Sequence, residues 1–149
     1  MQSATPLTPE VAAFLARARV AHLATADAAG QPHVVPMVFV VLDGRLYSPL
    51  DAKPKRVAVA RLRRVRNLLA NPRVAVVVDH YGEDWGRLGY VLWTGRASVL
   101  QAGDEAARAR AALRAKYAQY RAGPLRLDEA PLIVVEPQRV TAWGSLADG

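Results

Sequence analysis

The residues best suited to chemistry lie in one basic stretch, residues 47–73, with the sequence YSPLDAKPKRVAVARLRRVRNLLANPR. This stretch holds eight of the 20 lysines and arginines, and after Asp51 no acidic residue follows until Asp79. Two of the three lysines, Lys53 and Lys55, stand close together in it. A lysine ammonium can close on a phosphate as a point charge, whereas arginine favours planar, bidentate pairing. The pattern indicates a phosphate site at the lysines, followed by arginines that can bind further carboxylates or phosphates.

The same charges are also typical of a solvated helix face, because net charge bears on partners more than on fold. The formal net charge of +7 and a pI near 10.4 indicate an anionic partner: nucleic acid, anionic lipid or a charged small molecule. Residues 53–73 contain no aromatic side chain on which a base could stack, and no helix-turn-helix or zinc-finger pattern is present. No apolar run approaches the roughly 20 residues of a membrane span. A charged small molecule is therefore favoured, with no nucleic acid and no membrane as partner.

Few side chains could carry a reaction on their own. His22 and His33 lie in or beside apolar segments, where a lone histidine usually packs or caps, while His80 follows Asp79 at the end of a predicted strand. There is no cysteine, no metal-ligand spacing of histidines, no glycine elbow around a serine, and no glycine-rich phosphate loop. We therefore expect no metal site and expect a cofactor to carry the chemistry. Tyr47, His80 and solvent are the alternatives for a proton donor, and none of them is assigned.

The apolar segments predict mostly antiparallel strands. Segment 33–42 is β-branched and contains Pro36, so it is predicted to be a strand at a sheet edge or a bulge. Asp43 and Gly44 predict a tight hairpin turn after it. The other strands are predicted at 20–25, 45–48, 74–78, 90–100, 132–135 and 140–143, the last two separated by the Glu136-Pro137 break.

Three helices are predicted between these strands. The first begins with Thr8 as N-cap and Pro9 as first residue. The second has an apolar stripe at residues 58, 62, 65 and 69, with Arg61 and Arg64 as neighbours off that stripe. The third spans residues 102–120 and ends in two tyrosines three residues apart, which we interpret as packing residues.

Short antiparallel strands with inserted helices predict a mainly β (α+β) fold, a barrel-like sheet flanked by helices. The sequence has no repeat and no low-complexity linker, so we expect one domain over residues 1–149. The absence of cysteine fits a reducing compartment, and the first ten residues lack the basic and apolar regions of a signal peptide. We therefore expect a cytoplasmic protein.

Four segments, in this order, resemble the split β-barrel family related to pyridoxamine 5′-phosphate oxidase: VAHLATADAAGQPHVVPMVFVV, LYSPLDAKPKR, RLRRVRNLLANPRVAVVVDHY and GYVLWTGRASVL. The resemblance spans roughly residues 18–143, and within the superfamily the chain is similar to the branch that uses the deazaflavin coenzyme F420. It implies a homodimer with two cofactor sites at the subunit interface. By motif position, Lys53, Lys55 and Arg56 would hold the cofactor phosphate, and Tyr47 and Ser48 would lie between phosphate and ring.

The resemblance also implies contacts further along the cofactor. Val35, Pro36 and Met37 would lie along the ring, and Trp85 and Trp143 of the second subunit would complete the pocket. The lactyl-oligoglutamate tail of F420 would reach the helix arginines Arg61 and Arg64.

The chain departs from the true pyridoxamine phosphate oxidases at its C-terminal end. Those enzymes have a motif with Arg and His there, whereas this sequence reads VTAWGSLADG, so we do not expect oxidation of pyridoxamine phosphate. The resemblance then implies hydride transfer from reduced F420 to an electron-poor conjugated acceptor such as an enone, a quinone or a bilin. An FMN-binding split-barrel oxidoreductase, which would not use the helix arginines, and a non-enzymatic flavin or haem carrier are the alternatives.

Overall fold

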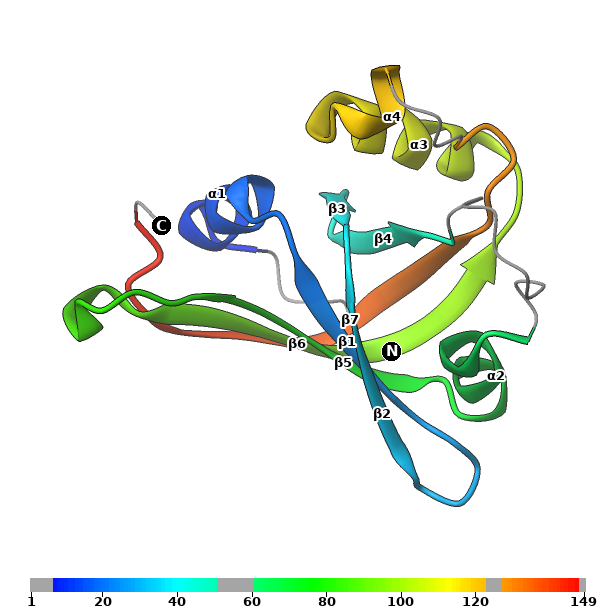
Figure 1. The fold of residues 1–149 in the computed structure, drawn as a ribbon, viewed down its shortest axis with the longest axis horizontal. Helices are drawn as coiled ribbons and strands as arrows, with labels where there is room; N and C mark the ends of the chain where they lie inside the picture. Colours follow the sequence, from blue (N-terminus) through cyan, green and yellow to red (C-terminus); the bar gives the residue numbers. More distant parts are fainter. Residues whose placement is uncertain (1–6, 51–60, 123–126, 148–149) are drawn as a thin grey trace.

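The computed structural model describes residues 7–50, 61–122 and 127–147. In these residues seven antiparallel strands form one curled sheet in the order β2-β1-β5-β6-β7-β4-β3, shown in Figure 1. The strands are β1 (Ala21–Ala26), β2 (Pro32–Met37), β3 (Val40–Leu42), β4 (Arg45–Pro49), β5 (Arg73–His80), β6 (Gly89–Leu100) and β7 (Leu132–Gly144). The helices are α1 (Pro9–Arg17), α2 (Arg63–Ala70), η2 (Trp85–Arg87), α3 (Asp104–Lys116) and α4 (Gln119–Ala122). The mainly β architecture with flanking helices is confirmed.

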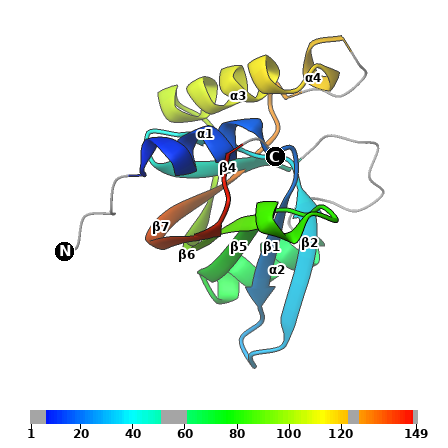
Figure 2. The ribbon, with the colours of Figure 1, turned by 90° about the vertical axis from the view of Figure 1, so that its left-hand side faces the viewer.

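The sheet buries its concave face. Side chains alternate along β6, where Val91 and Trp93 are 0% and 1% exposed while the residues between them face outward. α1 and α2 complete this core from two separate positions on the sheet (Figure 1), α1 through Phe14 and α2 through Val65. α3 packs on the opposite face, over β4 and β7, and forms a second apolar cluster with Tyr47. Figure 2 shows α3 lying above α1 and β4.

The first predicted helix is confirmed, and the second begins later than its stripe predicted. Thr8 caps α1 by accepting a hydrogen bond from Val11 N at 3.2 Å. α2 begins only at Arg63, because Leu62 is extended, with φ −62° and ψ 136°. The prediction that Leu69 belongs to the apolar stripe is also wrong, because Leu69 is 67% exposed, whereas Leu68 is 2% exposed. A hydrogen bond from Asn67 Nδ2 to Thr25 Oγ1, 3.0 Å long, orients the helix on β1 and turns Leu69 away.

The predicted strand 33–42 is two strands, which is a correction. β2 and β3 are the two edges of the sheet, and Val38 and Phe39 carry the chain from one edge to the other. Phe39 is fully buried, and its backbone N–H donates to the hydroxyl of Tyr117 at 3.1 Å. That hydroxyl lies 3.0 Å from the carbonyl oxygens of both Phe39 and Arg19. Ser48 Oγ donates to Val38 O at 2.7 Å. Ser48 of β4 and Tyr117, the residue after α3, therefore supply hydrogen-bond partners to the backbone of the crossing.

The two predicted C-terminal strands are one strand, β7, which continues through Glu136 and Pro137. The register against β6 shifts between Thr94 and Gly95, so β7 contains a β-bulge there. Gly95 pairs with Pro137, and a Cβ at Gly95 would lie 2.0 Å from Glu136 O. The proline is tolerated because it lies beyond Val135, the last residue that pairs with β4.

The third predicted helix, residues 102–120, is also interrupted. α3 ends at Lys116 because Tyr117 is extended, with φ −116° and ψ 114°, and a short α4 follows. Tyr117 and Tyr120 are packing residues as predicted, with ring centroids 6.2 Å apart in an edge-to-face arrangement. None of the described helices is long and apolar enough to cross a bilayer.

Replacing Tyr117 by Phe is expected to lower the free energy of unfolding by about 1–3 kcal/mol, because the buried Phe39 N–H loses its acceptor. Urea unfolding followed by far-UV circular dichroism measures the difference. The matched control is Tyr81→Phe, because Tyr81 is 62% exposed and its hydroxyl can bond to water. Equal stabilities of the two variants would show that the crossing does not depend on this hydroxyl.

Candidate functional site

The predicted ring residues lie on β2, and the edge position that Pro36 predicted is confirmed. Alternate residues of β2 differ in exposure, and Val35 and Met37 pack partly against the core. Pro36 therefore faces outward together with Val34, which is 63% exposed. The three predicted residues do not share one face. Val34 was missed in the sequence, although the period of two along a strand would have paired it with Pro36.

The predicted phosphate residues Lys53, Lys55 and Arg56 lie outside the described part of the chain. The structure describes the residues on either side of them. Leu50, which follows β4, is 1% exposed and donates from its backbone N to Pro131 O at 2.8 Å. On the other side α2 packs against β1 and β2, so the lysine segment leads directly to a helix beside the predicted ring strand.

The start of α2 is basic and lacks the usual capping. Leu62 stands at the N-cap, where it offers no side-chain hydrogen bond, and the first turn contains no acidic residue. Arg61 precedes the helix instead of lying on it, so it does not form the expected helical pair with Arg64. Arg61 and Arg63 are exposed and Arg64 is half-buried. Because a helix N-terminus carries partial positive charge, this arrangement favours an anion.

The convex face of the sheet carries an apolar surface that no described helix covers over β1, β5 and the start of β6. Cross-strand neighbours point to the same face. Pairing places Pro36 beside His22, His22 beside Val77, and Val77 beside Leu92. Tyr90 and Leu92 are 38% and 37% exposed. We call this surface the outer sheet face; its members are His22, Val34, Pro36, Val77, Tyr90, Leu92 and Trp143.

The predicted pocket residues Trp85 and Trp143 are exposed to 70% and 55%. Trp143 stacks on Tyr90 with ring centroids 5.7 Å apart, and Trp85 lies in the loop between β5 and β6. α2 precedes β5, so the eight residues of that strand separate the helix from the Trp85 loop, a distance of roughly 26 Å. Figure 1 shows the loop and α2 on opposite sides of the molecule. Within one chain, the tryptophans are not brought to the ring strand.

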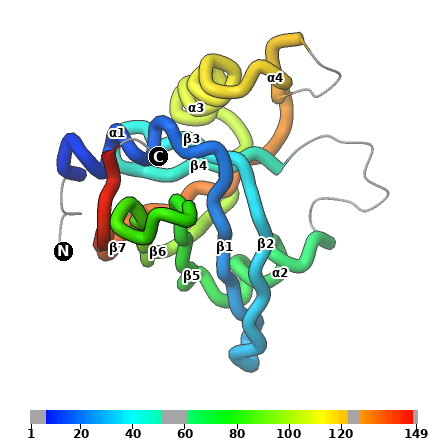
Figure 3. Tube along the Cα trace, turned by 60° about the vertical axis from the view of Figure 1, so that its left-hand side comes forward, coloured from blue at the N-terminus to red at the C-terminus, as the bar shows by residue number. Residues whose placement is uncertain are grey.

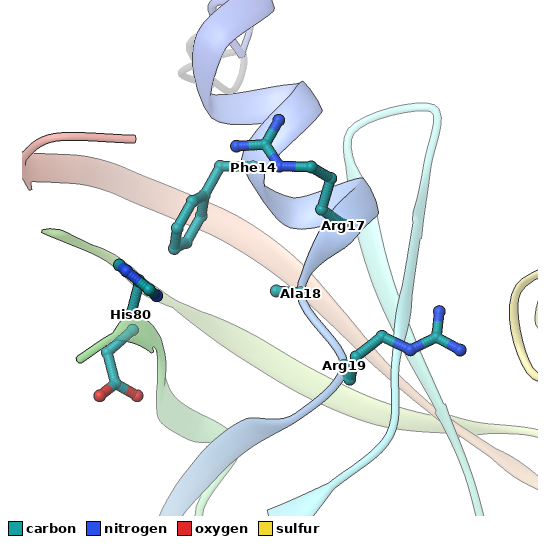
Figure 4. Close-up of a pocket in the computed structure, with 6 residues that line it drawn as sticks. Phe14, Arg17, Ala18, Arg19 and His80 are labelled. Atoms are coloured by element: carbon teal, nitrogen blue, oxygen red, sulfur yellow. The ribbon is translucent and has the colours of Figure 1, made fainter. Parts of the chain in front are cut away.

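His80 lines a small cavity of about 170 Å³ at the C-terminal end of α1. The cavity is lined by Phe14, Arg17, Ala18, Arg19, Asp79 and His80. Figure 4 shows Phe14 beside His80, with the Arg19 guanidinium turned away from both. Asp79 pairs with Tyr90 on the convex face, so alternation turns the His80 side chain to the concave face. The adjacent positions of Asp79 and His80 therefore do not make a hydrogen-bonded pair of acid and base.

Tyr47 belongs to a charged network under α3 instead of an open site. Its hydroxyl donates to Glu105 Oε2 at 2.5 Å, and Arg45 Nη1 donates to the same oxygen at 3.0 Å. Burial and the hydrogen bond to Glu105 raise the pKa of Tyr47 from 10.0 to about 12. The hydrogen bonds from Tyr47 and Arg45 lower the pKa of Glu105. A phenol held this strongly protonated is a poor proton donor at neutral pH, and the sequence contained no signal for this contact.

Ser48, predicted to lie between the cofactor phosphate and its ring, lies on β4. Ser48 is 3% exposed, and its hydroxyl donates a hydrogen bond to Val38 O. Tyr47 and Ser48 are consecutive in β4, so they face opposite sides of the sheet. Among the described residues, no three His, Asp or Glu side chains converge to hold a metal ion.

In the tube view of Figure 3, β1 and β2 run side by side, with α2 next to β2.

Comparison with known proteins gives a family match and a curated relative. The family model described as pyridoxamine 5′-phosphate oxidase matches residues 7–144. A 5a,11a-dehydrotetracycline/5a,11a-dehydrooxytetracycline reductase of Streptomyces rimosus is 28% identical over 144 residues, which cover 96% of this chain and 87% of the reductase.

Solved structures share the fold. A conserved hypothetical protein from Mycobacterium tuberculosis superposes with a TM-score of 0.73 at 21% identity, covering 95% of this chain and 86% of its own. The haem storage protein of Vibrio cholerae superposes with a TM-score of 0.71 at 19% identity, covering 94% of this chain and 95% of its own. An FAD-binding protein of Mesorhizobium loti superposes with a TM-score of 0.62 at 26% identity, covering 87% of each chain. The likeness to the first two, both under 25% identical, establishes the split-barrel fold alone.

Replacing Tyr47 by Phe is expected to reduce the loss of stability between about pH 10 and pH 12. The folded phenol keeps its proton up to a pKa of about 12, whereas the unfolded phenol loses it near 10.0. The unfolded state therefore binds fewer protons in that window, and the free energy of unfolding falls as pH rises. Urea unfolding at pH 9, 10 and 11 measures the slope. An unchanged slope in the variant would contradict the role given to the Tyr47–Glu105 pair.

Proposed function

Because the chain belongs to the pyridoxamine 5′-phosphate oxidase family, we propose that it is an oxidoreductase that uses coenzyme F420 to reduce an electron-poor conjugated acceptor. The observation that carries the reaction class is the relation to a tetracycline reductase over 96% of the chain. The substrate of that relative is a dehydro compound, which contains an additional carbon–carbon double bond. An enone, a quinone or a bilin offers a similarly unsaturated acceptor for a hydride.

The choice of F420 rests on the cations at the start of α2. FMN has one phosphate, for which Lys53, Lys55 and Arg56 suffice. The glutamate tail of F420 adds several carboxylates, and the basic N-terminus of α2 with Arg61 and Arg64 supplies a place for them. α2 packs beside β2, so a molecule that contacts the ring strand can extend toward these arginines.

The protein's task is to bind and orient the reactants, because the cofactor carries the reaction. When bound, reduced F420 supplies a hydride from the ring carbon that replaces a flavin nitrogen. Val34 and Pro36 offer an apolar, exposed surface to a planar ring. We assign no proton donor, because the pKa of Tyr47 is raised to about 12 and His80 faces the concave side of the sheet, away from Val34 and Pro36.

The second candidate is a flavin-dependent oxidoreductase or a flavin-binding protein. It is supported by the likeness to the FAD-binding protein of Mesorhizobium loti, at 26% identity. A flavin would use the lysine segment and the ring strand but would leave the α2 arginines without a ligand. Haem binding has weaker support, because the likeness to the Vibrio cholerae haem storage protein is at 19% identity.

Titration of the apo-protein with F420, FMN and FAD separates these functions. F420 is expected to bind most tightly, and Lys55→Ala should weaken F420 and FMN alike by roughly ten- to a hundredfold. The double change Arg61→Glu and Arg64→Glu should weaken the binding of F420 more than that of FMN. It should also weaken the binding of long-tailed F420 more than that of short-tailed F420. A higher salt concentration should reduce the preference for F420 over FMN, since the Debye length is only about 8 Å at physiological ionic strength.

The matched control for this titration is Arg66→Glu, an exposed arginine on the same helix one turn beyond its start. It should change the ratio of the two affinities little. If the double variant binds long-tailed F420 and FMN in the wild-type ratio, the arginines do not bind the tail, and the flavin alternative gains support.

We also propose that the protein is a homodimer whose subunits meet through the outer sheet face. Leu92, Tyr90 and Trp143 together expose a large apolar surface there, and aromatic side chains are favoured at interface centres. A second chain on this face would bring its Trp85 or Trp143 toward the ring strand of the first, which a single chain does not do. The cofactor site would then consist of residues from both subunits.

Light scattering at micromolar concentration tests the dimer. The wild type is expected at twice the chain mass, and Leu92→Arg should shift it to the monomer, because a charge in the apolar interface would be buried without a partner. Leu69→Arg is the control, since Leu69 is equally apolar and 67% exposed but lies on α2. A monomeric wild type with cofactor bound would rule the interface out.

A further inference from the structure

A groove between α1 and α3 contains two cations that the proposed hydride transfer does not use. It has a volume of about 530 Å³, which is within the range of small-molecule sites, about 300–1,000 Å³. The edge strand β3 forms its floor, and the two helices form its walls. The groove is lined by Ala12, Ala16, Arg19, Val40, Val41, Ala112, Ala115 and Lys116.

The walls of the groove are apolar and consist of small side chains. Ala12 and Ala16 are four residues apart, so they lie on one face of α1. Ala112 and Ala115 lie on α3 opposite them, and Arg19 and Lys116 supply the charged side chains of the lining. Apart from Arg19 and Lys116, the lining is apolar, so it offers surface to an aliphatic chain and no polar side chain along it.

The two cations are held by aromatic rings and a carbonyl. Lys116 Nζ lies 3.9 Å from the centroid of the Phe39 ring and donates to Leu15 O at 3.1 Å. The guanidinium of Arg19 lies 4.9 Å from the centroid of the Tyr117 ring. Figure 4 shows Arg19 pointing away from the His80 cavity. Both cations are thereby fixed near one another beside the groove.

Neither cation has a carboxylate within ion-pair distance among the described residues, although neighbouring arginines do. Arg45 pairs with Glu105 at 3.0 Å, and Arg108 and Arg114, on α3 itself, pair with Asp43 and Asp128. Burial, and then the charge of Arg19, lower the pKa of Lys116 to about 8. Lys116 is half-buried and Arg19 is exposed; the two like charges repel each other, and an anion between them would relieve that repulsion.

We propose that this groove binds an aliphatic carboxylate, with its carboxylate between Arg19 and Lys116 and its chain along the alanines of α1 and α3. The charge complementarity selects the head group, and the alanines of the two walls offer an apolar surface to the chain. The site is independent of the proposed reaction. It lies on the helices α1 and α3 and involves none of the residues given to the cofactor.

Isothermal titration with hexanoate, octanoate and decanoate, below their micelle concentrations, tests the site. Affinity should rise by about three- to fourfold for each added CH₂ group. Octylammonium, which has the same chain and the opposite charge, should not bind. A wild-type protein that binds none of the carboxylates, or binds octylammonium as well as octanoate, would overturn the proposal.

Variants of the groove separate specific binding from general charge effects. Arg19→Gln and Lys116→Met should each weaken decanoate about tenfold or more, whereas Arg108→Gln, on the same helix, should change little. Ala16→Leu fills the groove and keeps both cations, so it should abolish binding. Ala13→Leu is its matched control, because Ala13 is exposed on α1 but does not line the groove. Unchanged binding in Ala16→Leu, with a wild-type melting temperature, would show that the carboxylate binds elsewhere.

Discussion

The structure depends on the crossing of Val38 and Phe39 between the two edges of the sheet. β2 and β3 are six strand spacings apart in the sheet order, which would be roughly 29 Å in a flat sheet. The chain from Met37 to Val40 spans at most about 11 Å. The sheet must therefore curl until its edges approach one another. The hydroxyls of Tyr117 and Ser48 then satisfy the backbone of the crossing, which would otherwise be buried without partners.

The same crossing connects β2, the strand proposed to contact the ring, with β3 at the other edge of the sheet. β4 precedes the lysine segment and α2 follows it, and curling places α2 beside β2. The curl also separates two sheet faces with different roles. The concave face is filled by α1 and α2, while the convex face remains apolar and uncovered over β1, β5 and the start of β6 in the described chain.

The positive charge of the protein is divided between two kinds of position. Around α3 the arginines at 45, 108 and 114 are matched by Glu105, Asp43 and Asp128, in partly exposed pairs that contribute little stability each. The first turn of α2 contains no acidic residue, and neither cation of the groove beside α1 has a carboxylate within ion-pair distance among the described residues. The two groove cations make other contacts within the chain: Lys116 Nζ donates to Leu15 O, and the Arg19 guanidinium lies over the Tyr117 ring.

The sequence by itself determined the features that depend on neighbouring residues. Thr8 as a cap, the Asp43-Gly44 turn, the edge position of Pro36 and the alternation along β6 all follow from local backbone geometry. Tertiary structure decided that residues 33–42 form two strands, that Leu68 and not Leu69 is buried, and that β7 continues through Pro137. It also brought Tyr117 to Phe39, 78 positions away, and Lys116 to Leu15, 101 positions away. Periodicity reports which face of an element is apolar, but a hydrogen bond between distant residues depends on how the whole sheet curls.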